Sequence, residues 1–438
     1  MSKKAAVIGG GFAGVEAAVQ LARRGFRVDL YEMKPHRYSP AHSSENLAEL
    51  VCSNSFKAER LASAAGLLKT EMERLGSVCV ECAKQTKVPA GGALAVDRDK
   101  FSSLVTARIA EIENINVIRR EVSALPEADC VIIAAGPLAS DALSPVLDSL
   151  CGEGLHFFDA AAPIVSADSI DPDHSFAQSR YDRGGEDDYI NCPMNKEEYE
   201  LFYEALITAE GAHLHDVDKK KDVYEGCMPV EVLAKRGKDA IRYGPMKPVG
   251  LIDPNTGHRP WAVLQLRKEN DKGTLYNLVG FQTNLKFGEQ QRVFSMIPAL
   301  KNAKFERFGV MHRNTFIDSP RLLNSGFQLR KDPHIFFAGQ ITGVEGYMES
   351  AASGILAGIN AARYLSGQQN ICLPPETMLG ALSAYVADES IKNFQPMGAA
   401  MGLLPPVEEK IRDRAARYEA LAMRSLAALE AVMVEEKL

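Results

Sequence analysis

The chain is poor in several features that mark particular classes of protein. It has a single tryptophan, and its eight cysteines are scattered over 438 residues. That density fits reduced thiols in the cytosol better than a disulfide framework. No apolar run approaches the roughly 18 residues that a membrane helix needs. The apolar stretch after Lys4 is interrupted by three glycines, and no cleavage-like site follows it. We therefore expect a soluble, cytoplasmic protein without a signal peptide.

An excess of basic residues is also missing. Lysine and arginine number 50 against 57 aspartates and glutamates, and the formal net charge is −7. This balance argues against a protein that coats nucleic acid along its whole surface, but it does not exclude a local basic patch. The hydrophobic fraction of 46% is ordinary, and the length predicts two or three domains.

The order of the expected elements predicts an α/β fold. Residues 5–8 form a short apolar strand, a helix follows to about Arg24, and residues 26–32 form the next strand of a βαβ unit. Between about 160 and 310, short strands alternate with Gly/Pro turns. A buried strand and a long helix then return. We predict a Rossmann-type, glutathione-reductase-like FAD-binding domain (1–160 and 310–370), an inserted α+β domain (161–309) and a helical C-terminal tail (371–438).

A glycine-rich turn follows the first strand and carries the motif Gly9-x-Gly11-x-x-Gly14. Gly9 permits a tight turn, Gly11 lets a pyrophosphate approach the backbone, and Gly14 lets helix and strand pack closely. The helix N-terminus then offers free N–H groups to the pyrophosphate. Glu32 ends the second strand, 23 residues after Gly9, which is close to the spacing of a carboxylate that binds a ribose.

A second glycine-rich turn near the far end of the chain favours FAD over NAD. Residues 336–340 read Phe-Phe-Ala-Gly-Gln, and a helix is expected from Glu349 to Leu365. In FAD folds of this type, the N-terminus of such a helix points at the flavin. Gln340 stands where an aspartate is usual. The predicted cofactor-binding residues are Gly9, Gly11, Phe12, Ala13, Gly14, Glu32, Met33, Gly136, Gly339, Gln340, Gly346 and Tyr347.

The cysteines divide into two groups. Cys79-x-x-Cys82 has no second pair at a zinc-like spacing and lies among valines, so core packing is the better interpretation and no metal is expected. Cys130 and Cys151 flank apolar segments. Cys52 lies in a polar loop after the second strand, and Cys227 lies between turn-forming residues; thiols in such places are candidates for activation as thiolates.

Several stretches together resemble one family, the folate- and FAD-dependent tRNA (uracil-5-)-methyltransferases of the TrmFO family, which are related to GidA. The resemblance covers nearly the whole chain, and only the first stretch is widespread among flavoproteins. Near the end, Phe394–Met397 resembles a family motif, although Gly398 stands where a polar residue is expected. The resembling stretches are 9–18, 48–55, 89–98, 191–194, 225–229, 243–250, 279–283, 309–315 and 339–358.

The resemblance implies a reaction. A methylene group passes from 5,10-methylenetetrahydrofolate to carbon 5 of a uridine in the T-loop of tRNA, and FAD recharged by NADPH or NADH supplies the reducing equivalents. It implies that Cys227 is the nucleophile toward uracil, and that Cys52 is a general base or a partner in handling the methylene. Candidate contacts to folate or RNA are Arg242, Lys247, His312 and Arg313, with the run Lys219–Lys221 as a weaker candidate.

Other interpretations remain open. The same chemistry could act on ribosomal RNA, or the chain could be a GidA-type enzyme of the tRNA wobble position. A flavin-bearing RNA-binding protein without turnover and a small-molecule oxidoreductase are further possibilities. No second GxGxxG is recognisable, so we expect the nicotinamide cofactor to bind only transiently. The expected partners are the T-arm of tRNA and a folate, with no membrane and no obligatory protein partner.

A Cys227→Ala variant separates an enzyme from a protein that only binds RNA. The methyltransferase is expected to keep its yellow flavin and lose its methylated product, because uracil is a poor nucleophile without thiolate addition at carbon 6. A flavin absorption spectrum and a methylation assay measure the two properties. Unchanged RNA function in the variant would favour the binding protein.

Overall fold

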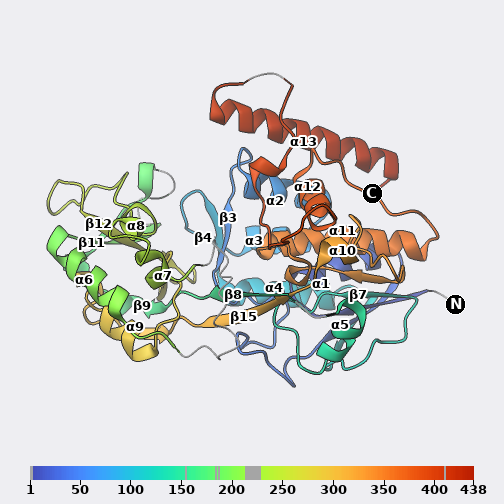
Figure 1. Cartoon of the computed structure of the whole chain (residues 1–438), viewed down its shortest axis with the longest axis horizontal. Helices are drawn as coiled ribbons and strands as arrows, with labels where there is room; N and C mark the ends of the chain where they lie inside the picture. The colour runs from blue at the N-terminus through green and yellow to red at the C-terminus, as the bar shows by residue number, and fades with distance from the viewer. Residues whose placement is uncertain (1–2, 153–154, 183–184, 186–187, 213–227, 409–410) are drawn as a thin grey trace.

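The computed structural model describes residues 3–152, 155–182, 185, 188–212, 228–408 and 411–438. Two large sheets lie in different parts of the molecule, and each has its own apolar core (Figure 1). The α/β class predicted from the sequence is confirmed. The proposed domain limits 1–160, 161–309, 310–370 and 371–438 remain predictions. Among the described residues, no helix is both long and apolar enough to cross a membrane.

The first sheet has five parallel strands and joins both ends of the expected cofactor-binding domain. Its central strand is apolar and buried along most of its length, as parallel strands covered on both faces are. The register pairs Ala5 with Val28 on one side and with Cys130 on the other. In spatial order, the strands are β16 (Ile335–Phe337), β7 (Cys130–Ile133), β1 (Lys4–Ile8), β2 (Arg27–Glu32) and β6 (Ile115–Arg119).

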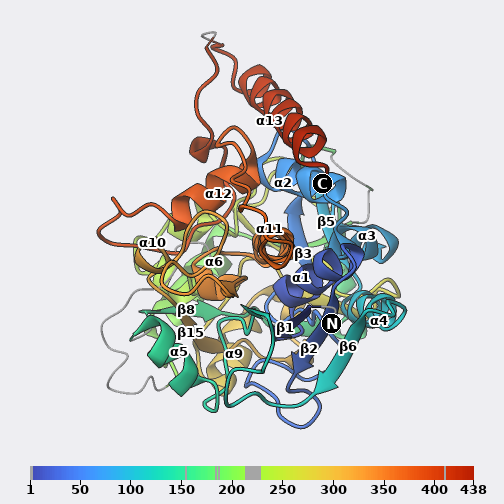
Figure 2. The same ribbon diagram turned by 90° about the vertical axis from the view of Figure 1, so that its right-hand side faces the viewer.

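Two buried helices lie side by side against this sheet (Figure 2). Helix α1 (Phe12–Arg23) and helix α11 (Tyr347–Leu365) are apolar around most of their circumference, which is typical of helices without a solvent face. Side-chain caps fix the ends of several other helices, for example Asp97 at the start of α4. The surrounding helices are α2 (Ala64–Arg74), α3 (Val78–Gln85), α4 (Arg98–Ala110), α5 (Ser144–Cys151) and α10 (Ser319–Leu322).

The second large sheet is antiparallel. Every one of its six strands lies between Ile164 and Arg307. The strands are β10 (Phe176–Ala177), β11 (Tyr189–Met194), β12 (Ala262–Lys268), β13 (Leu275–Leu278), β9 (Ile164–Ser166) and β14 (Phe305–Arg307), in spatial order. Its helices are α6 (Lys196–Thr208), α7 (Val230–Ala234), α8 (Ala240–Tyr243) and α9 (Phe287–Phe294).

Two smaller sheets connect these parts. The strands β8 (Leu155–Ala160) and β15 (Met311–Phe316) pair antiparallel, so the chain enters and leaves the antiparallel region along one ribbon. The strands β3 (Ser55–Ala58), β5 (Ala93–Val96) and β4 (Lys87–Val88) form a three-stranded sheet beside it.

The C-terminal tail, which the sequence predicts to be helical, contains two α-helices among its described residues. Helices α12 (Met378–Val386) and α13 (Arg414–Glu436) are separated by a segment whose described residues contain one short 3-10 helix, Met401–Leu403. Pro396, Pro405 and Pro406 explain the interruption, because proline cannot continue a helix. Leu421 and Leu429 on α13 are buried.

Two buried glutamates cap helices from a distance. Glu16 on α1 accepts hydrogen bonds from Ser77 and from the backbone of residues 78 and 79 at the start of α3. Glu71 on α2 accepts from the N–H groups of Met378 and Leu379 at 2.7 and 2.9 Å, and from Ser425 on α13. Each carboxylate therefore satisfies N–H groups that a helix leaves unpaired.

Lys69 on α2 is also buried, and its ammonium donates to the carbonyls of Phe56 and Ala58 at 2.7 and 2.8 Å. Burial lowers the pKa of this side chain to about 8. Below that pH the lysine is charged in both the folded and the unfolded chain. Between about 8 and 10.5 the unfolded chain keeps a proton that the folded chain has released, so stability rises with pH.

We expect a Lys69→Met variant to lose this pH dependence. The difference in the free energy of unfolding between the parent and the variant should change by roughly 3 kcal/mol in favour of the parent from pH 8 to pH 10.5. Urea unfolding followed by circular dichroism measures it. Lys84→Met, at an exposed lysine on α3, is the control. An equal pH dependence in all three proteins would contradict the prediction.

Candidate cofactor and active site

A cavity opens where β1, β2, β7 and β16 end, at the carboxyl edge of the parallel sheet. Ligands of open α/β sheets bind at this edge. Ten of the twelve residues predicted to bind the cofactor line this cavity, while Gly14 and Gly346 do not. The ten are Gly9, Gly11, Phe12, Ala13, Glu32, Met33, Gly136, Gly339, Gln340 and Tyr347.

The first glycine-rich turn shows a different physical constraint at each of its glycines. Gly9 has φ +106°, and a Cβ there would collide with the backbone of Ala134. A Cβ at Gly14 would collide with the carbonyl of Gly9, so this glycine allows α1 to pack onto the turn. A Cβ at Gly11 would meet nothing within 4 Å. The open space therefore lies at the glycine where the sequence places a pyrophosphate, and the turn fits a dinucleotide.

Glu32 lies at the cavity wall with 7% of its surface exposed. Its carboxylate accepts hydrogen bonds from the N–H of Gly10 at 3.0 Å and from the N–H of Lys34 at 2.9 Å. A carboxylate can accept about four hydrogen bonds, so acceptor capacity remains for ribose hydroxyls.

The second glycine-rich turn faces the same cavity from β16 and α11. Helix α11 begins at Tyr347, two residues earlier than the sequence predicts, with Gly346 at its N-cap. Gly346 has φ +123°, which a residue with a side chain rarely adopts, so the helix cannot start before it. Gln340 donates from its amide to both carboxylate oxygens of Glu345, at 2.9 and 2.8 Å.

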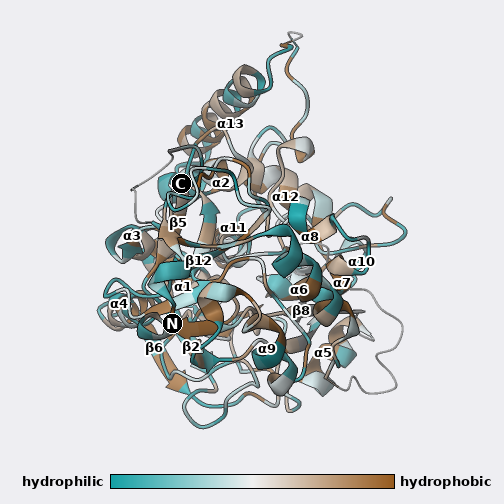
Figure 3. Cartoon of the chain, turned by 90° about the vertical axis from the view of Figure 1, so that its left-hand side faces the viewer, coloured by the Kyte–Doolittle hydropathy of each residue, from teal (hydrophilic) through white to brown (hydrophobic). Residues whose placement is uncertain are grey.

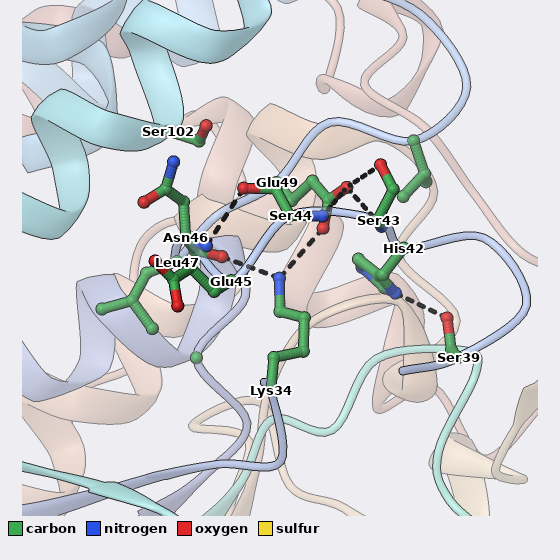
Figure 4. A network of polar contacts seen from close by, with 12 residues as sticks. Lys34, Ser39, His42, Ser43, Ser44, Glu45, Asn46, Leu47, Glu49 and Ser102 are labelled. Atoms are coloured by element: carbon green, nitrogen blue, oxygen red, sulfur yellow. Dashed lines mark hydrogen bonds and ion pairs between the residues drawn. The ribbon is translucent and has the colours of Figure 1, made fainter. Parts of the chain in front are cut away.

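The sequence did not single out the polar network in the loop after β2 (Figure 4). The ammonium of Lys34 is buried and donates to the carbonyl of Asn46 at 2.7 Å and to Glu49 at 3.0 Å. Although burial raises the pKa of Glu49, hydrogen bonds from Ser43 and the charge of Lys34 lower it below its usual value. Lys34, His42, Glu49, Arg120 and Val122 also line the cavity. For Lys34, His42 and Glu49 the only sequence signal was the polar loop after the second strand, and Arg120 and Val122, which follow β6, had none.

Cys52 lies at the end of this loop, beside the cavity residues Val51 and Tyr347. The hydroxyl oxygen of Tyr347 accepts hydrogen bonds from the N–H groups of Val51 and Cys52 at 2.8 and 2.9 Å, and it lies 3.1 Å from the sulfur of Cys52. Burial, together with the charge of Cys52, raises the pKa of Tyr347 well above its usual value. The phenol therefore stays protonated and holds the cysteine loop against α11.

Three arginines surround the same loop. Arg98 from α4 donates to the carbonyl of Leu50, and Arg307 from β14 donates to the carbonyl of Val51, both at 2.8 Å. Arg267 from β12 donates to the hydroxyl of Ser53 at 3.0 Å. Glu269 pairs with Arg98 and partly balances these charges. Cationic groups of this kind stabilise a thiolate, so the surroundings of Cys52 suit a reactive cysteine.

The other predicted site residues lie elsewhere or outside the described residues. Cys227 and the run Lys219–Lys221 fall outside them. Arg242 is in helix α8 and contacts Trp261, and Lys247 follows that helix; neither lines the cavity. His312 and Arg313 belong to strand β15, which continues toward Phe316 beside the parallel sheet.

Of the other described cysteines, four are buried, Cys151 is partly buried and Cys372 is exposed. Cys79, Cys82 and Cys130 are fully buried, which confirms the packing interpretation of the CxxC pair. Burial raises the pKa of the Cys82 thiol to about 12, so it does not ionise at neutral pH. Among the described residues, no group of histidine, cysteine and carboxylate side chains could hold a metal ion.

The parallel sheet, the two glycine turns and the cavity between them define a protein of the FAD-dependent oxidoreductase fold. The family model of glucose inhibited division protein A matches residues 4–369. A methylenetetrahydrofolate–tRNA-(uracil-5-)-methyltransferase TrmFO from Acetivibrio thermocellus is 58% identical over 97% of both chains. One from Lactobacillus gasseri is 54% identical over the full length of both. This chain belongs to the TrmFO branch of the glucose inhibited division protein A family.

A solved structure supports the fold. GidA from Aquifex aeolicus superposes with a TM-score of 0.69 over 98% of this chain and 73% of that one. The sequences are 16% identical, so this likeness concerns the architecture alone.

A Gly11→Ala variant tests the cofactor assignment without disturbing the fold. Gly11 has φ −78°, so alanine fits the backbone, and its methyl group would occupy the space open to a pyrophosphate. We expect at least tenfold weaker FAD binding, measured by flavin fluorescence, with an unchanged melting temperature of the cofactor-free protein. Gly288→Ala, at another open position on α9, is the control. Full FAD affinity in Gly11→Ala would contradict the assignment.

Proposed function

We propose that this protein methylates carbon 5 of a T-loop uridine in tRNA, with 5,10-methylenetetrahydrofolate as the methylene donor. The observation that carries the proposal is the position of Cys52, which Tyr347 holds beside the dinucleotide cavity among three arginines. The proposal also rests on membership of the TrmFO family, whose members bear this activity in their names.

The cofactor is FAD, which when bound and recharged by NADPH or NADH supplies the two electrons that convert methylene to methyl. Gly9–Ala13 would hold its pyrophosphate, Glu32 its ribose, and the start of α11 would face its flavin. The nicotinamide cofactor visits only during recharging. The reaction takes place in the cytoplasm.

The cysteines of the chain handle the uridine. The thiolate of Cys227 adds to carbon 6, which makes carbon 5 enolate-like and able to bond to the methylene carbon. Removal of the proton from carbon 5 and cleavage of the bond between the methylene carbon and the folate nitrogen release tetrahydrofolate. After the methylene has been reduced to methyl, elimination of the thiolate restores the ring. Cys52 serves as the base for that proton or takes part in handling the methylene.

The charged groups around Cys52 keep it reactive. Arg98, Arg267 and Arg307 stabilise a thiolate at this position, and the protonated Tyr347 can return a proton or hold the loop in place. Arg242, Lys247, His312 and Arg313 are proposed to contact the folate or the phosphates of the RNA.

The decisive experiment combines purified yellow protein, an unmodified tRNA transcript, labelled methylenetetrahydrofolate and NADPH. We expect labelled 5-methyluridine in this transcript and none in a transcript without the T-loop uridine. Cys52→Ala should reduce the product at least 100-fold, because general acid–base steps contribute about 10²- to 10⁴-fold. Cys372→Ala, at an exposed cysteine, is the control. Flavin reduction without labelled tRNA would reject the proposal and direct the assay to ribosomal RNA.

A further inference from the structure

A positively charged stretch runs through the antiparallel region. From Met228 to the end of β12 at Lys268, eight lysines and arginines accompany three acidic residues, whereas the whole chain has a net charge of −7. Two of the three acids, Glu231 and Asp253, are buried. The third, Asp239, lies 3.5 Å from Arg242. Arg267 is also buried and Lys238 pairs with Glu200, so the stretch carries a moderate excess of exposed positive charge on an otherwise acidic protein.

An exposed tyrosine lies in the middle of this basic stretch. Tyr243, the last residue of α8, has 70% of its surface exposed. The guanidinium of Arg242 lies 5.2 Å from the centre of its ring and 3.8 Å from the centre of the Trp261 ring. Arg242 also donates to the carbonyl of Trp261 at 2.9 Å. The arginine therefore contacts both rings, and most of the surface of Tyr243 lies in solvent.

A second exposed ring, from a different segment of the chain, packs against the loop that follows α8. Tyr181 is 53% exposed, and its backbone N–H donates to the carbonyl of Gly250. A Cβ at Gly250 would come within 3.0 to 3.2 Å of the Tyr181 ring, so the ring lies directly on this loop. Val249 and Ile252 on the same loop are 39% and 59% exposed. Figure 3 shows this end of the molecule, where α6, α7 and α8 lie together.

Strand β12 connects these rings to the cysteine loop. Leu264 and Leu266 pack into the antiparallel core, while the side chains of Gln265 and Arg267 face the other way; Trp261 directly precedes the strand and also packs against that core. Trp261 contacts Arg242, Gln265 accepts from Arg180 next to Tyr181, and Arg267 donates to Ser53 next to Cys52. Six residue steps at about 3.3 Å separate the two ends by roughly 20 Å.

We propose that Tyr243, Tyr181 and the basic side chains around them form a docking surface for the loop of the substrate RNA. The "tyrosine surface" comprises Tyr181, Tyr243, Lys247, Val249 and Ile252. RNA is the partner because exposed rings stack on unpaired bases and cations bind phosphates, a combination that recognises single-stranded RNA. The inference rests on the proposed function. On this surface, the protein would bind bases and phosphates of the RNA that lie about 20 Å from the reacting uridine.

The test measures binding of a T-arm stem-loop RNA to the FAD-loaded protein by fluorescence anisotropy. Tyr243→Ala should weaken binding at least fivefold, because stacking on an aromatic side chain contributes about 1 to 3 kcal/mol per base. Tyr243→Phe should stay within twofold of the parent, because it keeps the ring. Lys247→Ala should weaken binding. It should also reduce the slope of the logarithm of the binding constant against the logarithm of the salt concentration by about one, because one phosphate contact is lost.

Leu201→Ala is the matched control. Leu201 is 66% exposed in the same region, but it lies on α6 next to acidic Glu197, Glu198, Glu200 and Glu204. We expect no change in RNA binding. At saturating RNA, Tyr243→Ala should methylate at the parental rate, so the loss appears in KM and not in kcat.

Each outcome has a distinct meaning. Equal RNA affinity of the parent and Tyr243→Ala, with methylation intact, would overturn the docking surface and leave the proposed function standing. A parent that neither binds nor methylates the RNA would overturn both. A change of oligomeric state in Tyr243→Ala, seen by light scattering with RNA affinity unchanged, would assign the surface to contact between copies of the chain and overturn the inference.

Discussion

The close approach of helices α1 and α11 is the constraint on which the cofactor cavity depends. A Cβ at Gly354 would fall within 3 Å of the backbone of Ala13, and one at Gly358 would do the same at Ala17. Because neither glycine has a side chain, the two backbones touch, as interfaces rich in small residues allow. This contact joins the first glycine turn to the second across more than 300 residues of sequence, so both turns face one cavity.

The same packing gives the cysteine loop its position. Tyr347 at the start of α11 packs against Phe12 at the start of α1, with ring centres 4.8 Å apart. Its hydroxyl then holds the backbone of residues 51 and 52. The opposite side of the loop is held by arginines that come from α4 and from the antiparallel sheet. The thiol of Cys52 therefore has a defined position outside any helix or strand, because several hydrogen bonds fix the backbone of its loop.

Three buried ionisable side chains that stabilise the fold each have hydrogen-bond partners. Glu16 and Glu71 each accept several hydrogen bonds at a helix start, and Lys69 donates to two carbonyls. Burial raises the pKa of both glutamates and lowers that of the lysine, so the interior disfavours the charged form in all three cases. Sequence patterns alone do not separate such structural charges from catalytic ones. Glu16, which belongs to the family-like stretch after the glycine turn, caps a helix and does not line the cavity.

The sequence by itself determined the βαβ start, the two glycine turns, Glu32 and the burial of the CxxC pair, because these features depend on local periodicity and on backbone conformations that few residues allow. It also pointed to the family through short stretches spread along the chain. Only the tertiary structure decided that Tyr347 meets Cys52, that Lys34 pairs with Glu49 at the cavity wall, and that three arginines surround the cysteine loop. These contacts join residues from distant elements, and no local pattern encodes them. The prolines of the C-terminal tail account for its interruption, whereas the exposure of Tyr243 beside Arg242, whose guanidinium lies over Trp261, depends on tertiary packing.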